Sequence, residues 1–233
     1  MKTIGMLGGM AWPSTLEYYR MLNEYVMEAT AGQNGPHTAR IILYSVDFHH
    51  VEQIRTSRDW EEWGRKMAEY AKALEGAGAD FIMICTNTMH RLADVVEEAV
   101  GIPILHIGDA TAEAIKKEGL NYVGLLGTKT TMAEDFLRKR LEEHGIRTIV
   151  PEEGDMNVVD EIIRSELVRN VIRKQSRLKL VDIIKKLAEK GAEGVILACT
   201  ELPLLVSQGE VDVPLFDTTR IHAVAAAEFA LKA

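Results

Sequence analysis

The sequence predicts an α/β fold, because short apolar segments alternate with amphipathic helical segments along its 233 residues. Eight mainly aliphatic segments are expected to form strands, and their near-continuous apolarity is typical of parallel strands that are buried on both faces. These segments are 2–7, 40–45, 81–84, 104–106, 122–126, 147–150, 194–198 and 214–216. Between them, apolar residues such as Met67, Ala71 and Leu74 recur at helical spacing.

An internal repeat predicts two similar lobes. Ile4-Gly-Met-Leu-Gly-Gly-Met10 is echoed by Val123-Gly-Leu-Leu-Gly-Thr-Lys129, and segment 78–86 is echoed by segment 191–199. We therefore expect a first lobe of residues 1–103 plus 217–233 and a second lobe of residues 104–216. The closing helix, 218–232, is expected to pack on the first lobe. Ligands of parallel sheets bind at the carboxyl ends of strands, where Gly8, Thr86, Gly127 and Cys199 are placed.

The composition limits the kind of partner. Lys and Arg number 27 against 35 Asp and Glu, giving a net charge of −8, which argues against nucleic acid or an anionic membrane as the main partner. No apolar run reaches the roughly 18 residues of a membrane span, and the first residues resemble a strand more than a signal peptide. Two cysteines form no disulfide framework. We expect a soluble, cytoplasmic protein that binds a small molecule.

No motif predicts a cofactor or a metal. Gly5-Met-Leu-Gly-Gly9 lacks the G-x-G-x-x-G spacing of dinucleotide sites, and favours a tight turn whose N–H groups face a small anion. Gly124-Leu-Leu-Gly-Thr-Lys-Thr130 lacks the adjacent Gly and Lys of a phosphate loop. The histidines and cysteines show no spacing typical of metal ligands.

The two cysteine segments carry the strongest chemical signal. Cys85-Thr-Asn-Thr-Met-His90 and Cys199-Thr-Glu-Leu-Pro203 each place polar groups directly after an expected strand. A lone cysteine is more often a small buried hydrophobe, but such a residue has no need of polar neighbours. A thiol near helix N-termini is expected to have a lowered pKa and to serve as a base. Two acid/base groups on opposite sides of one carbon suit racemisation or epimerisation.

At these residues the chain resembles the aspartate/glutamate racemases that act without pyridoxal phosphate. The resemblance covers essentially the whole chain, through Gly8-Gly-Met10, Asn87-Thr-Met-His90, Gly124-Leu-Leu-Gly-Thr128, Cys199-Thr-Glu201 and Asp217. It implies two lobes related by a pseudo-twofold axis that enclose the substrate, and a cofactor-independent isomerase that forms a homodimer. It also implies that two opposed cysteines act as acid and base.

The chain departs from this pattern at one position. In most family members a cysteine directly precedes Asn-Thr, whereas here Thr86 does so. The repeat agrees, because Thr86 follows Gly78 by eight residues, as Cys199 follows Gly191. A one-residue offset in a strand turns a side chain to the other face. Thr86 is therefore expected to face the substrate cleft that the resemblance implies between the lobes, and Cys85 is expected to face the sheet. With Ser45-Val-Asp-Phe-His49, this resembles a subgroup with a Thr/Cys pair that is described as acting on L-aspartate and L-glutamate; a broader amino-acid range stays open.

Thr86 and Cys199 are therefore the expected catalytic residues. The resemblance implies a set of residues that contact the substrate, with Met10 acting through its backbone: Met10, Arg55, Asn87, Thr88, Met89, Arg169, Thr200 and Glu201. Arg55 is implied to reach the distal carboxylate of the substrate, and its alternative interpretation is a solvated loop charge. The alternative interpretation of Arg169 is a surface arginine of a helix. Two rival functions remain, a related isomerase or decarboxylase with one working cysteine and a small-anion binding module.

Overall fold

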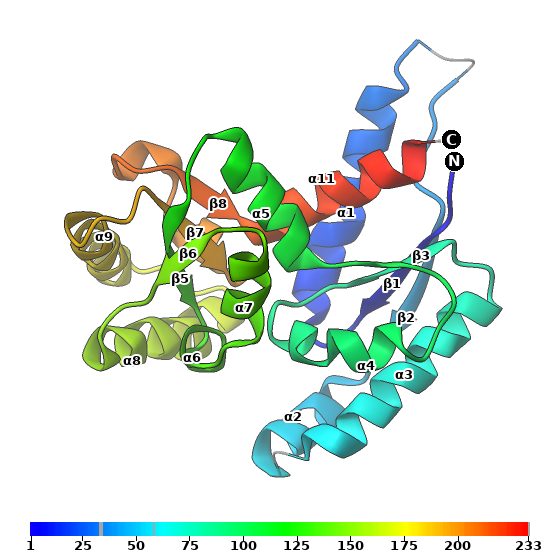
Figure 1. The fold of residues 1–233 in the computed structure, drawn as a ribbon, viewed down its shortest axis with the longest axis horizontal. Helices are drawn as coiled ribbons and strands as arrows, with labels where there is room; N and C mark the ends of the chain where they lie inside the picture. The colour runs from blue at the N-terminus through cyan, green and yellow to red at the C-terminus, as the bar shows by residue number, and fades with distance from the viewer. Residues whose placement is uncertain (33–34, 58, 233) are drawn as a thin grey trace. The chain divides into compact units, whose positions relative to one another are not determined.

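The computed structural model describes residues 1–32, 35–57 and 59–232, except for the side chains of residues 54–56. Its strands form two four-stranded parallel sheets, each flanked by helices (Figure 1). The α/β class with two similar sheets is confirmed, and all eight expected strands are present within one or two residues at their ends. The chain divides into two compact units, which are Met1–Ile107 with His222–Ala233 and Gly108–Ile221.

Unit 1 contains the sheet with strand order β2-β1-β3-β4. Its strands are β1 (Ile4–Gly8), β2 (Ile41–Ser45), β3 (Phe81–Ile84) and β4 (Ile104–Leu105). Its helical segments are α1 (Trp12–Ala29), α2 (Phe48–Ser57), α3 (Trp60–Gly76), η1 (Thr88–Leu92), α4 (Ala93–Glu97) and, from His222 onward, α11 (Thr218–Leu231).

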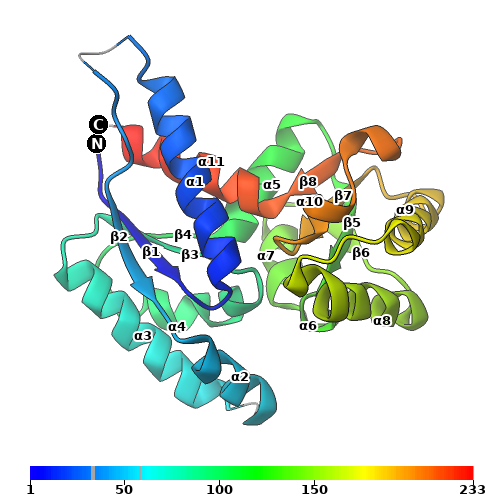
Figure 2. The same cartoon turned by 180° about the vertical axis from the view of Figure 1, so that it is seen from behind.

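Alternate residues of β1 and β3 point to opposite faces of this sheet, as the period of two in a strand requires. On one face, Met6 and Met83 pack with residues of α1 and α11. On the other face, Leu7, Ile82 and Ile84 pack with residues of α3 and α4. Figures 1 and 2 show these helix pairs on the two sides of the sheet. The central strands are thus buried on both faces, and the closing helix packs on this unit as expected.

Unit 2 repeats the same arrangement, with strand order β6-β5-β7-β8. Its strands are β5 (Tyr122–Gly127), β6 (Arg147–Ile149), β7 (Gly194–Ala198) and β8 (Leu215–Asp217). Its helical segments are α5 (Ile107–Lys117), α6 (Lys129–Ala133), α7 (Phe136–Glu143), α8 (Glu153–Glu161), the π-helical η2 (Ile162–Glu166), η3 (Leu167–Arg169), α9 (Lys174–Glu189), α10 (Leu202–Leu205) and η4 (Gln208–Glu210). The core on one face joins Leu126, Val195 and Leu197 to residues of α8 and α9.

The unit boundaries differ by a few residues from the expected lobes. β4 pairs with β3 in the first sheet, so the chain leaves unit 1 after Ile107 and not after residue 103. It returns at His222, within the first turns of α11, and not at residue 217. Hydrophobic runs alone did not reveal these boundaries, because β4 and the start of α5 follow one another directly.

The edge strand β2 departs from the burial expected on both faces. Leu43 keeps 44% of its surface exposed, and Ser45 is exposed as well. A strand at the edge of a sheet has a neighbour on one side only, so its side chains meet fewer covering groups.

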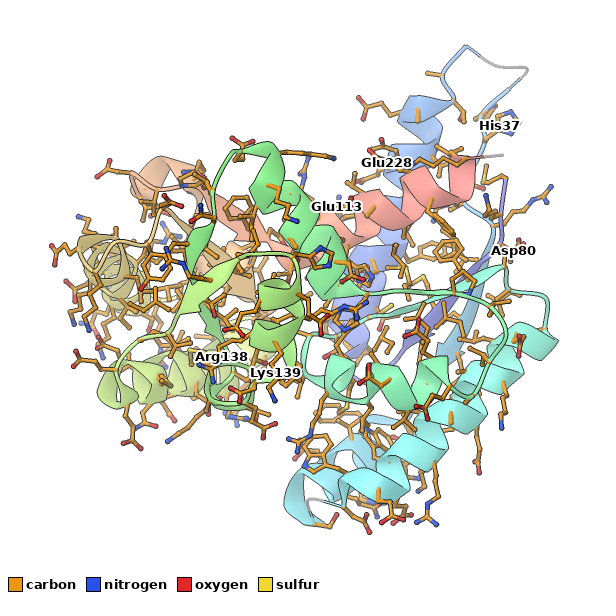
Figure 3. The ribbon with its side chains drawn as sticks, viewed as in Figure 1. His37, Asp80, Glu113, Arg138, Lys139 and Glu228 are labelled. Carbon is orange, nitrogen blue, oxygen red and sulfur yellow. The ribbon has the colours of Figure 1, made fainter. Side chains whose placement is uncertain are left out.

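Termini and helices of unit 1 are joined by polar contacts at the surface. The Tyr25 hydroxyl on α1 donates to the Glu228 carboxylate on α11 over 3.0 Å, and the Thr3 amide donates to Asp80 over 2.6 Å (Figure 3). The first contact is partly buried and the second is exposed.

Inside unit 1, His222 is fully buried. Its Nε2 lies 2.8 Å from the Leu105 carbonyl oxygen, and its Nδ1 lies 3.1 Å from the Tyr18 hydroxyl. Because a carbonyl oxygen only accepts, Nε2 carries the proton and Nδ1 accepts from Tyr18. Burial, and to a lesser extent the neighbouring His106, lowers the pKa of His222 to about 4, although the bond to Leu105 opposes the change.

We predict that His222 makes the unfolding free energy depend on pH between about 6.5 and about 4. Its stabilising contribution is complete above the unfolded pKa and is lost as the pH falls toward the folded pKa, because only the unfolded chain takes up the proton. The loss amounts to about 3 kcal/mol over this window. Urea unfolding at several pH values should show a shallower pH dependence for His222→Gln, in which an amide replaces the titrating ring.

The control is His37→Gln, because His37 is exposed and lies on the same unit (Figure 3). This variant should retain the wild-type pH dependence. Equal slopes for His222→Gln and the wild type would contradict the prediction.

Candidate active site

The end of β3 decides how Cys85 and Thr86 are oriented. Leu7 pairs with Ile84, and the Cys85 amide donates to the Leu7 carbonyl over 2.9 Å. Cys85 is 1% exposed and packs in the same apolar cluster as Met83, and burial raises the pKa of its thiol. Cys85 thus faces the interior, as the sequence predicts. Thr86, one residue beyond, is half-buried.

The pairing register makes Thr86 the counterpart of Cys199. In unit 2, Leu126 pairs with Leu197 and Gly127 with Ala198, and the repeat aligns Leu126 with Leu7. Ile84 and Leu197 are then equivalent, and Thr86 and Cys199 each lie two residues after these equivalent positions. Both residues follow the third strand in the order of their sheet. This strand is β3 in unit 1 and β7 in unit 2.

The turn after β1 packs against the end of β2 and the start of α1. Gly9 has a φ of +81°, and a Cβ atom there would lie 2.3 Å from the Val46 nitrogen, so only glycine fits. The Gly9 amide donates to the Thr15 hydroxyl of α1 over 2.9 Å. The Met10 side chain is 4% exposed and lies in the core, which leaves its backbone as the part that can face a ligand.

The residues after Thr86 are buried or half-buried. Asn87 is 6% exposed, and Thr88, which is half-buried, begins η1. The Trp63 indole donates to the Met89 sulfur over 3.0 Å, and Met89 is in the core of unit 1. The side chain of Met89 is thus occupied in packing, and any role of Met89 toward a ligand falls to its backbone.

At the end of β7, one carboxylate holds two donors. The Cys199 thiol and the Thr200 hydroxyl each donate to Oε2 of Glu201 over 3.0 Å. All three residues are half-buried. The structure therefore brings together Cys199, Thr200 and Glu201, which the sequence had grouped.

The expectation of a lowered pKa for Cys199 is wrong. Burial, followed by the charge and the hydrogen bond of Glu201, holds the pKa of the Cys199 thiol well above its usual value. The Glu201 backbone amide and the positive charge of Arg164 act in the opposite direction but are weaker. The helix that follows, α10, has only four residues and supplies little dipole. Without ligand the thiol is protonated at neutral pH.

An arginine other than the two predicted ones acts on this cluster. Arg169 is exposed at the end of η3, and the side chain of Arg55 lies outside the described residues. Arg164, on the π-helical η2, influences Cys199 through its charge and is paired with Asp160 over 2.7 Å. Arg164 was not among the residues expected from the sequence. The i,i+4 pair with Asp160 was visible in the sequence, but its proximity to residue 199 depends on the fold.

Neither a metal-binding group of side chains nor a membrane-spanning helix is present in the described part of the chain. No group of three or more His, Cys, Asp or Glu side chains there is arranged to hold a metal ion. Within the same residues, no helix is both long enough and apolar enough to span a membrane.

A family model described as Asp/Glu/Hydantoin racemase matches residues 7–226. The chain belongs to this family. A solved structure described as a "putative Asp/Glu racemase" from Yersinia pestis is 48% identical, covers 100% of both chains and superposes with a TM-score of 0.94. An aspartate racemase homologue from Pyrococcus horikoshii OT3 is 39% identical over 99% of each chain, with a TM-score of 0.85.

Among curated proteins, the broad specificity amino-acid racemase RacX of Bacillus subtilis (strain 168) is 24% identical over 218 residues, which are 93% of this chain and 92% of RacX. Racemases are isomerases, and the chain is of the Asp/Glu racemase type. An arylmalonate decarboxylase shares only the fold, at 15% identity and a TM-score of 0.53 over 100% of this chain and 94% of the decarboxylase. The resemblance to the racemase family read from the sequence is thus confirmed.

We predict that Glu201→Gln lowers the pKa of the Cys199 thiol, because it removes the negative charge and weakens the acceptor that hold the proton on sulfur. The rate of alkylation of Cys199 by iodoacetamide, measured against pH, should shift to lower pH. The measurement uses a Cys85→Ala background so that a single thiol reacts. Glu189→Gln, which removes the same charge from an exposed position on α9, should leave the profile in place. An unshifted profile for Glu201→Gln would refute the assignment.

Proposed function

We propose that this chain is a cofactor-independent racemase that inverts the α-carbon of an amino acid, with aspartate and glutamate as the leading substrates. The observation that carries the proposal is the matched register of Thr86 and Cys199 after equivalent strands. The family membership and the racemases among its relatives support the same reaction class. The similarity to a broad specificity racemase leaves neutral amino acids open as further substrates.

In the proposed reaction, Cys199 and Thr86 act on opposite faces of the substrate α-carbon. Sγ of Cys199 first loses its proton to solvent, while Glu201, its hydrogen-bond acceptor at 3.0 Å, stays a carboxylate. The thiolate then takes the α-proton, and the electron pair of the C–H bond passes into the carboxylate-stabilised carbanion. A proton delivered from the Thr86 side, directly or through water, completes the inversion, and exchange with solvent then restores the protonation states of both groups. Backbone N–H groups at the strand ends would stabilise the developing charge.

The substrate itself would favour the thiolate. A positive charge near a thiol lowers its pKa, and an amino acid carries an ammonium group on the carbon that reacts. Arg164 already has this effect in part. The raised pKa of the Cys199 thiol is therefore compatible with a cysteine base that ionises when the substrate binds.

The remaining parts of the proposal concern binding and assembly. Asn87, Thr88, Thr200 and Glu201 are proposed to bind the α-carboxylate and ammonium groups, together with the backbones of Met10 and Met89. Arg55 and Arg169 are proposed for the distal carboxylate. A cytoplasmic homodimer without metal or pyridoxal phosphate is proposed from the resemblance to the family and from the acidic composition.

The decisive experiment follows the α-proton of L- and D-aspartate in D₂O by NMR, with glutamate and neutral amino acids alongside. A racemase exchanges the α-proton and produces the opposite enantiomer, after exhaustive dialysis against EDTA as well as before it. A small-anion binding module would give no exchange, and a decarboxylase would release CO₂. Activity that disappears on dialysis and returns with one added cofactor would overturn the cofactor-independent mechanism.

We predict that Cys199→Ser lowers α-proton exchange by on the order of 10²–10⁴-fold, since a hydroxyl supplies little base at neutral pH. The rates are measured by NMR in D₂O. Cys85→Ala is the matched control, because Cys85 lies in the core and should leave exchange nearly unchanged. If Cys85→Ala abolishes exchange while Cys199→Ser retains it, the assignment of the thiol is wrong.

We further predict that the two enantiomers exchange at unequal rates, because a threonine hydroxyl is a much weaker acid than a thiol and is hardly ionised at neutral pH. Equal energies of the enantiomers fix the final ratio at one, so the asymmetry appears in kcat and KM for each direction. Thr86→Cys should accelerate the slower exchange. Equal exchange rates in the wild type, unchanged by Thr86→Cys, would remove Thr86 from the mechanism.

A further inference from the structure

One side chain of unit 1 links the backbone of Thr86 to the start of α5. The ring of His90 is 3% exposed. Its Nδ1 lies 2.8 Å from the Thr86 carbonyl oxygen, and its Nε2 lies 3.1 Å from the Ile107 amide nitrogen. Ile107 is the first residue of α5 and the last residue of unit 1 before the chain crosses to unit 2.

These two contacts fix the protonation state of the ring. The Thr86 carbonyl can only accept, so Nδ1 must carry a proton. The Ile107 amide can only donate, so Nε2 must be without one. His90 is therefore neutral, with its proton on Nδ1, and both of its ring nitrogens serve as bridges between main-chain segments.

The contacts hold the main chain of Thr86 from both sides. The Thr86 amide donates to the Ile84 carbonyl over 2.9 Å, and the Thr86 carbonyl accepts from His90. Since β3 ends at Ile84, the strand ladder does not fix Thr86. The main chain of Thr86, from which its side chain projects, is therefore held at both its amide and its carbonyl, and the carbonyl contact is made by the His90 ring.

The surroundings keep this ring in place. The rings of His106 and His222 pack edge-on against it, with centroid separations of 4.6 and 5.7 Å. His222 is in turn bonded to the Leu105 carbonyl. The segment 105–107 is thus tied to the His90 ring by its amide and to the neighbouring ring by its carbonyl.

We propose that His90 is a positioning residue for racemisation, which orients Thr86 through the Thr86 carbonyl. This inference rests on the proposed function, in which Thr86 serves one face of the substrate. Misplacement of a reacting group by about 1 Å can cost on the order of 10²-fold in rate. The loss should fall on the step served by Thr86 and not on the step served by Cys199.

Two amide variants separate the two contacts of His90. In His90→Asn, the amide nitrogen can occupy the place of Nδ1 and donate to the Thr86 carbonyl, but nothing reaches the Ile107 amide. In His90→Gln, the longer side chain brings an amide oxygen to the place of Nε2, where it can accept from Ile107, and the bond to Thr86 is lost. His37→Asn and His37→Gln, at an exposed position of the same unit, are the controls.

The readout is the ratio of inversion to α-proton exchange with retention, measured in D₂O on the enantiomer whose proton faces Cys199. This ratio does not depend on the fraction of folded protein. We expect His90→Gln to lower it on the order of 10²-fold, while His90→Asn and both His37 variants stay within a few-fold of the wild type.

An unchanged ratio in His90→Gln, with exchange and inversion equally reduced or both retained, would overturn the positioning role. A wild-type protein that inverts no amino acid would instead overturn the proposed function, and this inference with it. The ring itself offers an independent test. The ¹⁵N spectrum of His90 in the wild type should show a protonated Nδ1 and an unprotonated Nε2, and the opposite tautomer would overturn the inference whatever the kinetics.

Discussion

The candidate site depends on one constraint, the parallel pairing of β1 with β3 and of β5 with β7. Side chains alternate between the two faces of a strand, so a shift of one residue exchanges core and surface. The register of β1 with β3 puts Cys85 into the core, and the same register in β5 with β7 puts Ala198 there. The residue that follows, Thr86 or Cys199, is half-buried at the strand end. The chemistry available at each end is decided by this single offset.

Much of this arrangement could be predicted from the sequence, because it depends on local patterns. The apolar runs predict all eight strands, and the spacing from Gly78 to Thr86 and from Gly191 to Cys199 predicts the equivalence of Thr86 and Cys199. The orientation of Cys85 followed from that count. Short-range periodicity was enough, since a buried strand tolerates few other patterns.

What could not be predicted depends on contacts between residues far apart in the chain. The pKa of Cys199 was expected to be lowered by nearby helices, but burial and the carboxylate of Glu201 outweigh a four-residue helix. The approach of Arg164 to Cys199 and the bond between His90 and Ile107 arise only when the sheet and helices are assembled. The exposure of β2 was not predicted either. Its position at the edge of the sheet depends on how the other strands pair, and the residues of β2 alone do not indicate it.

The two strand ends are controlled by different physical means. At Cys199 the protein controls acidity, since burial and Glu201 hold the proton on sulfur. A thiol with a raised pKa is a poorer acid but, once ionised, a stronger base, and the α-proton of an amino acid is a weak acid that requires a strong base. At Thr86 no such tuning is available, because the hydroxyl stays protonated throughout the neutral range. Only its position can be adjusted, and the main chain of Thr86 is held at both its amide and its carbonyl. Equivalent places in two similar units thus serve one proposed reaction through electrostatics on one side and geometry on the other.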